Sequence, residues 1–274
     1  MTGPVVCDLD GVVWRGEESV PGAAEGVAAL RRAGLRVGFV TNNSSPTIAE
    51  TVSRLARAGV AAGPDDVLSS AQASAALLAA DLGRGARVLA CAGPGVREAL
   101  ASRGLTAVDA GPAVAVVVGW HRDFDFERLA TAADAVRDGA RFVATNLDAT
   151  YPVPGGLLPG AGALVAAVAT ASGVTPEVAG KPSPGMAALV RDRFGADGVV
   201  VGDRPTTDGG LARALGWPFA LVRSGIGGAP GGEPVPVPPP EFLAADLGEL
   251  APVLVAARAS GPTASSHAGR ARRG

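Results

Sequence analysis

The sequence predicts an α/β protein built around a doubly wound parallel sheet. Short Val-rich runs end in acidic or hydroxyl residues, and segments with helix start and stop signals lie between them. Apolar runs of this length, bounded by turn residues, are typical of buried parallel strands. Their alternation with helices is typical of an open α/β sheet with helices on both faces.

The first and last parts of the chain carry the units of this sheet. Each predicted strand is an apolar run that stops at polar residues, and each predicted helix stops just before a Gly. The second helix also begins with a Pro, which the first turn of a helix tolerates because its N–H has no partner there. Strands are predicted at 3–9, 34–40 and 198–202, and helices at 25–33 and 46–58.

The middle of the chain repeats the alternation. Strands are predicted at 87–92, 114–119 and 141–145, and helices at 124–137 and 160–171. This repeat predicts a second α/β unit inserted into the first. After residue 260 the chain becomes small, polar and Arg-rich, which predicts a disordered tail.

Composition excludes several classes of function. The 274 residues exceed what one hydrophobic core usually organises, and 47% hydrophobic residues are ample for packed cores. No apolar run reaches the roughly 18 residues of a membrane span, so no membrane partner is expected. Two cysteines are too few for a disulfide framework, which favours a reduced, cytoplasmic location. A formal net charge of −2 gives no case for nucleic-acid binding.

Acidic residues gather where predicted strands end. Asp8 and Asp10 follow the first strand, and Asp203 and Asp208 follow the strand at 198–202. Open α/β sheets bind ligands beyond the carboxyl ends of their strands, so these acids share one rim if the strands are neighbours. Buried acids need a partner, and a divalent cation such as Mg²⁺ suits carboxylate oxygens. The structural alternatives are a simple Asp-Gly turn for the first pair and a helix N-terminal acid for Asp208.

Hydroxyl and basic residues mark a second kind of site. Thr41 and Asn42 open a polar turn before the second predicted helix, where hydroxyls and backbone N–H groups can hold a phosphate. An ordinary helix cap at Ser44 or Ser45 is the alternative. Lys181 is the single lysine among 24 basic residues, and a compact ammonium there can neutralise phosphate charge.

Other chemistries find few suitable residues. Of the two histidines, His267 lies in the predicted tail and His121 is expected at the surface, so a serine hydrolase triad is hard to assemble. Cys7 and Cys91 lack the spacing of a zinc or redox site. The sequence contains no P-loop motif, which disfavours a P-loop nucleotidase.

Taken together, these segments resemble the haloacid dehalogenase superfamily and, in finer detail, its subfamily IIA phosphatases. The order also matches: an Asp-x-Asp motif, a Thr, a Lys and an acidic Gly-Asp motif. The resemblance spans roughly residues 5–225. The finer matches are Asp8-Leu9-Asp10-Gly11-Val12-Val13-Trp14, Thr41-Asn42-Asn43-Ser44-Ser45, Ala144-Thr145-Asn146-Leu147-Asp148-Ala149-Thr150-Tyr151-Pro152 and Gly180-Lys181-Pro182-Ser183-Pro184.

The resemblance implies a catalytic role for three acids. Asp8 matches the nucleophile and a Mg²⁺ ligand. Asp10 matches the general acid/base, and its backbone carbonyl matches a second metal ligand. Asp203 matches the third protein ligand of the metal. An Asp at position 10 favours phosphatases and phosphomutases, because dehalogenase relatives lack this acid and P-type ATPases carry Thr there.

The resemblance also implies the residues that hold the phosphate. Thr41, Asn42 and Lys181 match phosphate binders, with Asn42 donating its backbone N–H, and Asp208 matches the supporting acid of the last motif. The chain departs from the family pattern around Asp208, where Pro205-Thr206 and Gly209-Gly210 replace the usual residues.

A large cap domain is part of the same resemblance. Asn146, Asp148 and Tyr151 then lie in a cap loop that faces the catalytic rim, either as substrate contacts or as loop-stabilising residues. The resemblance implies a Rossmann-like core domain of residues 1–82 and 177–260 and an inserted α/β cap domain of 83–176, and composition adds the disordered tail of 261–274.

The predicted activity is Mg²⁺-dependent hydrolysis of a small phosphorylated metabolite, such as glycerol phosphate or phosphoglycolate. The reaction passes through an aspartyl-phosphate on Asp8. A phosphomutase and a non-catalytic phosphate-binding module are the alternatives, and a homodimer is left open.

Overall fold

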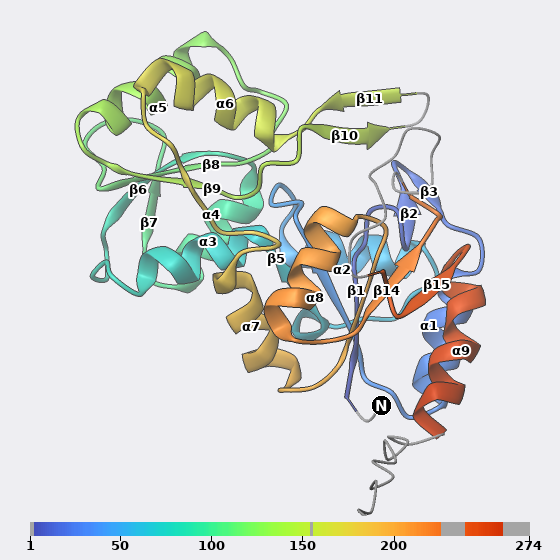
Figure 1. Ribbon diagram of the computed structural model, residues 1–274. Helices are drawn as coiled ribbons and strands as arrows, with labels where there is room; N and C mark the ends of the chain where they lie inside the picture. Colours follow the sequence, from blue (N-terminus) through green and yellow to red (C-terminus); the bar gives the residue numbers. More distant parts are fainter. Residues whose placement is uncertain (1–2, 154–155, 226–238, 260–274) are drawn as a thin grey trace, which may run out of the picture.

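The computed structural model describes residues 3–153, 156–225 and 239–259, and these fold into two parallel sheets with helices on their faces (Figure 1). The predicted α/β class is therefore confirmed. The predicted tail at 261–274 lies outside the described residues. Within the described ranges, no helix combines the length and the apolar character needed to cross a bilayer.

The larger sheet carries the strands predicted near the two ends of the chain. It is formed by β1 (Val5–Cys7), β4 (Val37–Thr41), β5 (Val67–Ser69), β13 (Val199–Gly202), β14 (Phe219–Val222) and β15 (Phe242–Ala244). The strands are parallel in the order β15-β14-β13-β1-β4-β5. Cys7 is the register partner of both Phe39 and Val201, so β4 and β13 flank β1 on its two sides. Three of the predicted strands are thus neighbours.

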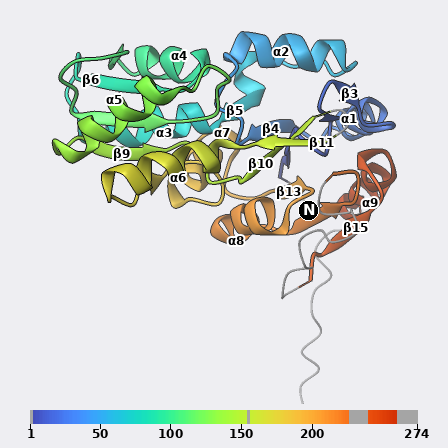
Figure 2. The same cartoon turned by 90° about the horizontal axis from the view of Figure 1, so that it is seen from above.

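Helices cover both faces of this sheet because side chains alternate along each strand. They are α1 (Ala23–Arg32), α2 (Ile48–Arg57), α3 (Ser70–Ala79), α7 (Pro184–Phe194), α8 (Gly210–Leu215) and α9 (Leu247–Ala259), with a 3₁₀ turn at Pro64–Asp66. Val5 and Cys7 pack into a buried cluster with α1, α2 and α9, whereas Val6 packs into a cluster with α3, α7 and α8. Figures 1 and 2 show α1 and α9 side by side.

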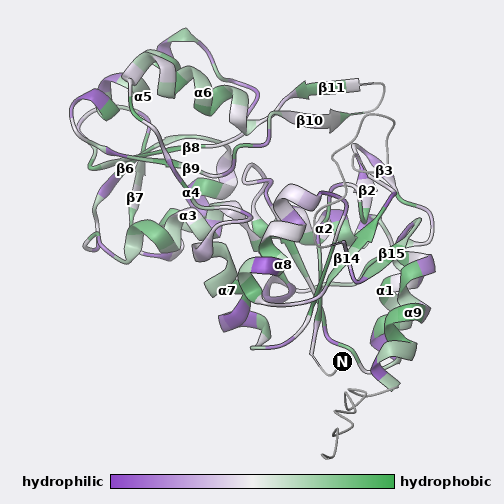
Figure 3. Ribbon diagram, in the orientation of Figure 1, coloured by the Kyte–Doolittle hydropathy of each residue, from purple (hydrophilic) through white to green (hydrophobic). Residues whose placement is uncertain are grey.

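The smaller sheet confirms the predicted second α/β unit. It is formed by β6 (Arg87–Cys91), β7 (Thr106–Val108), β8 (Ala115–Val118), β9 (Arg141–Ala144) and β12 (Glu177–Val178), with helices α4 (Pro94–Ser102), α5 (Phe126–Arg137) and α6 (Ala161–Ser172). Leu89 and Val116 pack against α5 and α6, while Val88 and Val117 share an apolar cluster with α3 and α4. That cluster also contains Val6 of the larger sheet, so α3 packs between the two units (Figure 3).

Two antiparallel hairpins lie near the carboxyl edge of the larger sheet. They are β2 (Trp14–Arg15) with β3 (Glu18–Ser19), and β10 (Thr150–Val153) with β11 (Gly156–Pro159). The second hairpin leaves the smaller unit and reaches towards the first (Figures 1 and 2). The proposed division into core and cap at residues 82/83 and 176/177 stays a prediction. By pairing, β12 extends the smaller sheet to Val178, past that second boundary.

The polar turn after β4 differs from the expected helix cap. The N-cap of α2 is Thr47, whose side chain accepts a hydrogen bond from the backbone N–H of Glu50 while Glu50 accepts one from the N–H of Thr47. This reciprocal pair is a capping box. The alternative of a cap at Ser44 or Ser45 is therefore wrong, and the Ser44 hydroxyl instead donates to Thr145 Oγ1 at 3.1 Å.

Candidate active site

Adjacent parallel strands bring the predicted rim residues together. Asp8 follows β1 directly, Thr41 is the last residue of β4, and Asp203 follows β13. All three side chains line one cavity of about 400 Å³ at the carboxyl edge of the larger sheet. Since the carboxyl ends of neighbouring parallel strands meet, residues distant in sequence converge there.

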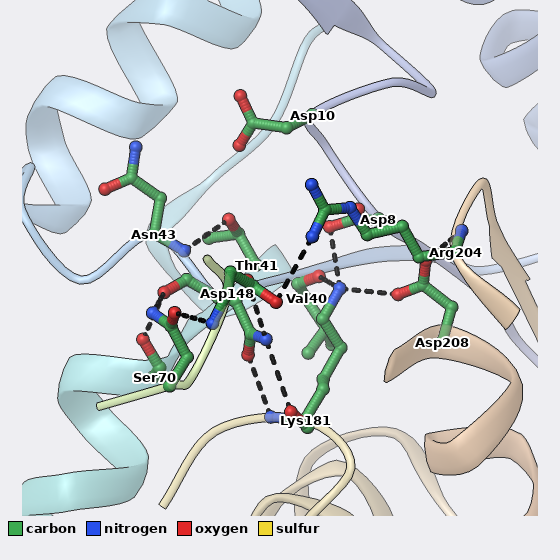
Figure 4. Close-up of polar contacts among 12 residues, drawn as sticks. Asp8, Asp10, Val40, Thr41, Asn43, Ser70, Asp148, Lys181, Arg204 and Asp208 are labelled. Atoms are coloured by element: carbon green, nitrogen blue, oxygen red, sulfur yellow. Dashed lines mark hydrogen bonds and ion pairs between the residues drawn. The ribbon is translucent and has the colours of Figure 1, made fainter. Parts of the chain in front are cut away.

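Lys181 lies at the centre of the polar contacts (Figure 4). Its Nζ donates to Asp8 Oδ1 at 2.7 Å, to Asp208 Oδ1 at 2.7 Å and to the carbonyl of Val40 at 3.0 Å. The lysine is 3% exposed, so its charge depends on these partners rather than on water. All three donors of the ammonium are thereby used.

Burial and neighbouring charges shift the pKa values of Lys181, Asp8 and Asp208 in opposite directions. Burial lowers the pKa of Lys181, but the negative charges of Asp208 and Asp8 raise it by more, so the net shift is upward. Burial raises the pKa of Asp8, and the nearby lysine only partly offsets it. Burial also raises the pKa of Asp208, to about 6. One ammonium thus serves two buried acids.

The carboxylates of Asp8, Asp203 and Asp208 offer oxygen atoms that all lie within 4.8 Å of one another. Two glycines lie against the Asp203 carboxylate. A Cβ added to Gly11 would lie 2.5 Å from Asp203 Cγ, and a Cβ added to Gly225 would lie 2.0 Å from Asp203 Oδ2. Gly11 also has a φ of +91°, which favours glycine. The local backbone therefore holds the Asp203 carboxylate closely, and the donor set suits a hard divalent cation.

Asp10 is placed apart from those three carboxylates, although it lines the same cavity. Its Oδ1 accepts a hydrogen bond from Trp14 Nε1 at 3.0 Å. The guanidinium of Arg54 in α2 lies over the Trp14 ring at 4.1 Å and donates to the carbonyl of Gly16. Burial raises the pKa of Asp10, while Arg54 and the Trp14 hydrogen bond lower it. A carboxyl in such surroundings suits a proton donor.

Although the residues around Asp208 depart from the family pattern, Asp208 still lies in the site. Residues Pro205–Gly209 form a π-helical turn with Pro205 at its start, followed by α8. Asp208 is fully buried, and its Oδ2 accepts from the backbone N–H of Arg204 at 3.1 Å. A Cβ on Gly210 would lie 2.6 Å from the Cβ of Pro182, so glycine permits close packing against the segment that carries Lys181.

Asn42 links the turn after β4 to the lysine segment. Its Oδ1 accepts from the backbone N–H of Lys181 at 2.8 Å, and its Nδ2 donates to the Lys181 carbonyl at 3.2 Å. The Asn42 carbonyl accepts from Ser70 Oγ and from Asn146 Nδ2, both at 2.6 Å. Thr41 Oγ1 accepts from the N–H of Asn43 at 3.0 Å. Side chains thus fix this turn on three sides.

Residues of the smaller unit complete the cavity. Asn146, Asp148 and Tyr151 all line it, as the sequence analysis placed them. Asn146 and Asp148 also bond to the larger unit, and Asp148 Oδ2 accepts from Asn42 Nδ2 at 3.2 Å. Tyr151 packs on Trp120 with ring centroids 4.7 Å apart. Asn146 and Asp148 therefore stabilise the loop by hydrogen bonding, whereas substrate contact by any of the three residues stays a prediction.

Known proteins that this chain resembles include several phosphatases. Family models described as haloacid dehalogenase-like hydrolase and HAD-hydrolase-like match residues 5–106 and 178–250. An acid sugar phosphatase of Staphylococcus saprophyticus is 37% identical over 204 residues, covering 73% of this chain and 78% of that protein. The chain belongs to the haloacid dehalogenase-like hydrolases. The predicted family, with its subfamily IIA phosphatases, is confirmed.

Two further comparisons identify similar proteins from one organism. D-glycerol 3-phosphate phosphatase of Mycobacterium tuberculosis is 41% identical over 230 residues, which cover 82% of this chain. The aligned region spans 64% of the length of that relative. A crystal structure of glycerol phosphate phosphatase from the same organism, in complex with magnesium, superposes with a TM-score of 0.81 at 38% identity, covering 91% of this chain and 77% of the other.

Several residues of this hydrolase were missed by the sequence analysis. Arg204 directly follows Asp203 and reaches Asp148, and that adjacency was the available signal. Arg54 stands in an amphipathic helix, a position that does not mark a site in sequence, whereas Trp120 follows the strand predicted at 114–119, and that strand end was the available signal. His121 was expected at the surface, which is wrong: it is 6% exposed, and its Nδ1 lies 2.9 Å from the carbonyl of Gly119.

Proposed function

We propose that this hydrolase is a Mg²⁺-dependent phosphomonoesterase for small phosphorylated metabolites, acting through an aspartyl-phosphate on Asp8. The observation that carries the proposal is the buried Lys181 ammonium between Asp8 and Asp208, whose carboxylates cluster with that of Asp203. The names of the relatives, D-glycerol 3-phosphate phosphatase and acid sugar phosphatase, support the substrate class.

The carboxylates of Asp8 and Asp203, with the backbone carbonyl of Asp10, are the proposed ligands of the metal. Oxygen donors and the close glycine backbone around Asp203 fit a small hard cation. When bound, Mg²⁺ supplies positive charge that stabilises the phosphoryl oxygens. The magnesium complex of the mycobacterial relative supports this choice of ion.

Each side chain of the site has its own role in this reaction. Asp8 attacks phosphorus and forms the covalent intermediate while the bond between phosphorus and the leaving-group oxygen breaks, and Asp10 protonates that oxygen. Asp10 then takes a proton from a water that attacks phosphorus, which breaks the bond to Asp8 and releases inorganic phosphate. Lys181 and the turn of Thr41 and Asn42 stabilise the negative charge of the phosphoryl group. Asp208 holds the Lys181 ammonium in place through its 2.7 Å contact.

The test compares wild type with Asp8→Asn on p-nitrophenyl phosphate and a panel of phosphorylated metabolites, with Mg²⁺ and with EDTA. We expect metal-dependent release of inorganic phosphate from wild type and none from the variant. Asp134→Asn is the matched control, because this exposed acid pairs with Arg137 on α5 and should leave activity unchanged. Activity retained by Asp8→Asn would sink the mechanism, and an isomeric product without phosphate release would identify a phosphomutase.

A further inference from the structure

Residues 41–47, here named the β4 turn, run from the end of β4 to the start of α2. Thr41 and Asn42, which the proposed function assigns to the phosphoryl group, line the cavity together with Asn43. The turn then leaves the cavity and ends at Thr47, the N-cap of α2. The contacts that hold the far end of this turn therefore also decide where its cavity end lies.

The far end of the β4 turn packs against the carboxyl edge of the smaller sheet. The strand order of that sheet, β12-β9-β8-β6-β7, reverses between β6 and β8. Open α/β sheets usually bind a ligand beyond the carboxyl ends of the strands at such a reversal. A Cβ added to Gly93, shortly after β6, would lie 2.3 Å from Ser45 Oγ, and one added to Gly119, directly after β8, would lie 2.6 Å from the hydroxyl of Ser44. The β4 turn of the larger unit thus occupies this position.

Helix α4, which follows β6, contacts the backbone of the β4 turn. The N–H of Gly95 in α4 donates to the carbonyl of Ser45 at 2.8 Å. A Cβ added to Gly95 would lie 2.2 Å from the carbonyl oxygen of Pro46 and 2.7 Å from that of Ser44. Both are backbone atoms, so they can give way only if the turn itself or the helix shifts. The absence of a side chain at Gly95 therefore permits the close approach of α4 to the turn.

Local hydrogen bonds connect this contact to the cavity. The N–H of Ser45 donates to Asn43 Oδ1 at 3.1 Å. The N–H of Asn43 donates in turn to Thr41 Oγ1 at 3.0 Å (Figure 4). Together with the bond from Gly95, these contacts form a continuous chain from α4 to the hydroxyl of Thr41. A displacement of Ser45 is thereby passed to the cavity.

Helix α4 is itself anchored in the protein core. Val96 and Leu100 are fully buried in the apolar cluster that α4 shares with α3. On its exposed side, Glu98 Oε2 accepts from the backbone N–H of Ile48, the first residue of α2, at 2.9 Å. This N–H has no partner within its own helix, and a carboxylate suits the positive end of the helix dipole. Helix α4 therefore holds the β4 turn at Ser45 and again at the start of α2.

We infer that Gly95 and Glu98 are positioning residues for phosphate binding, which fix the β4 turn from the smaller unit although neither is among the described residues that line the cavity. The inference rests on the proposed function, because it concerns the phosphate-binding end of the same turn. Since α4 is anchored in the core, a Cβ at position 95 displaces the turn rather than the helix. The loss therefore falls on the binding of the phosphoryl group.

The test compares wild type with Gly95→Ala in the Mg²⁺-dependent hydrolysis of p-nitrophenyl phosphate and in its inhibition by inorganic phosphate. We expect KM and the inhibition constant of phosphate each to rise about tenfold, because a 1 Å misplacement of a binding group can cost about a hundredfold. A purely structural defect would lower kcat through the unfolded fraction and leave both constants at their wild-type values. Gly185→Ala is the matched control, because Gly185 also follows a Pro at the start of a helix, α7, and its added Cβ would meet nothing closer than 3.8 Å. Both constants should stay unchanged in this control.

Two further variants test the path of the effect. Asn43→Ala breaks the chain between Ser45 and Thr41, so its loss of phosphate affinity and that of Gly95→Ala should be less than additive in the double variant. Glu98→Ala should raise the inhibition constant about threefold, and Glu98→Gln, which can still accept from the N–H of Ile48, should restore the wild-type value.

An unchanged inhibition constant in Gly95→Ala, or additive losses in the double variant, would overturn the inference while leaving the phosphatase proposal standing. If Gly95→Ala does not fold, equal inhibition constants in wild type and Glu98→Ala would overturn it. Failure of wild type to cleave any phosphate ester would instead refute the proposed function, and the inference with it.

Discussion

Replacing Lys181 with Met should destabilise the protein strongly at neutral pH. The substitution keeps most of the side-chain volume but removes the ammonium that bonds to Asp8 and Asp208 at 2.7 Å each. Both acids are buried, at 8% and 0% exposure, so water cannot replace the lost partner. Breaking a buried ion pair from one side costs about 3–5 kcal/mol, and here one cation serves two acids.

The loss should shrink at acidic pH. Burial already raises the pKa of Asp208 from 3.8 to about 6 with the lysine present. An acid with a raised pKa binds more protons in the folded state, so its ionisation lowers stability as pH rises between these two values. Without Lys181 the pKa must rise further, because its largest opposing influence is gone. The variant should therefore lose more stability relative to wild type at pH 7 than at pH 5.

The measurement is urea unfolding followed by circular dichroism in metal-free buffer at both pH values. Arg141→Met is the control, because its guanidinium also contacts two acids, Glu177 and Asp81, but is 28% exposed. The control should lose less than about 1 kcal/mol. A loss below about 1 kcal/mol for Lys181→Met at pH 7, or equal losses at the two pH values, would refute the electrostatic reasoning.

Two further substitutions probe residues that position the site. Arg54→Ala removes the guanidinium that lies 4.1 Å from the Trp14 ring and should loosen the placement of Asp10. We expect kcat to fall about tenfold for alkyl phosphates and far less for p-nitrophenyl phosphate, because the leaving group of the latter needs little protonation. Equal losses of kcat on both substrates would contradict this reasoning. Gly202→Ala puts a Cβ 2.2 Å from Asp208 Cγ and should cost about 1–3 kcal/mol in urea unfolding together with most of the activity. Gly185→Ala, whose Cβ meets nothing closer than 3.8 Å, is the control, and a wild-type-like Gly202→Ala would show that Asp208 can move freely.

Strand-end residues could be predicted because parallel sheets place function at one edge. Asp8, Thr41 and Asp203 each end or follow an apolar run that the sequence marks clearly. The strands β5, β14 and β15 were not predicted, and they extend the same sheet on both sides. Missing them did not affect the site, because the three strands that carry it are neighbours at the centre.

Which of the acids cluster together was harder to predict from the sequence. The sequence placed all four acids at one rim without grouping them, whereas in the structure the carboxylates of Asp8, Asp203 and Asp208 have oxygens within 4.8 Å of one another and Asp10 bonds to Trp14. The chain turns after Asp8, so alternation along an extended strand no longer applies to Asp10. The π-helical turn carrying Asp208 likewise has no distinctive periodicity in sequence.

The sequence by itself determined the class of fold, the family and the residues capable of phosphoryl chemistry, because strand patterning and the motifs are local properties of the chain. Only the tertiary structure decided which partner each charge has. Lys181 meets Asp8 across 173 positions, and Asp148 meets Arg204 across the boundary between the two sheets. Such pairings depend on how helices and loops pack in three dimensions, and they set the buried charge at the rim.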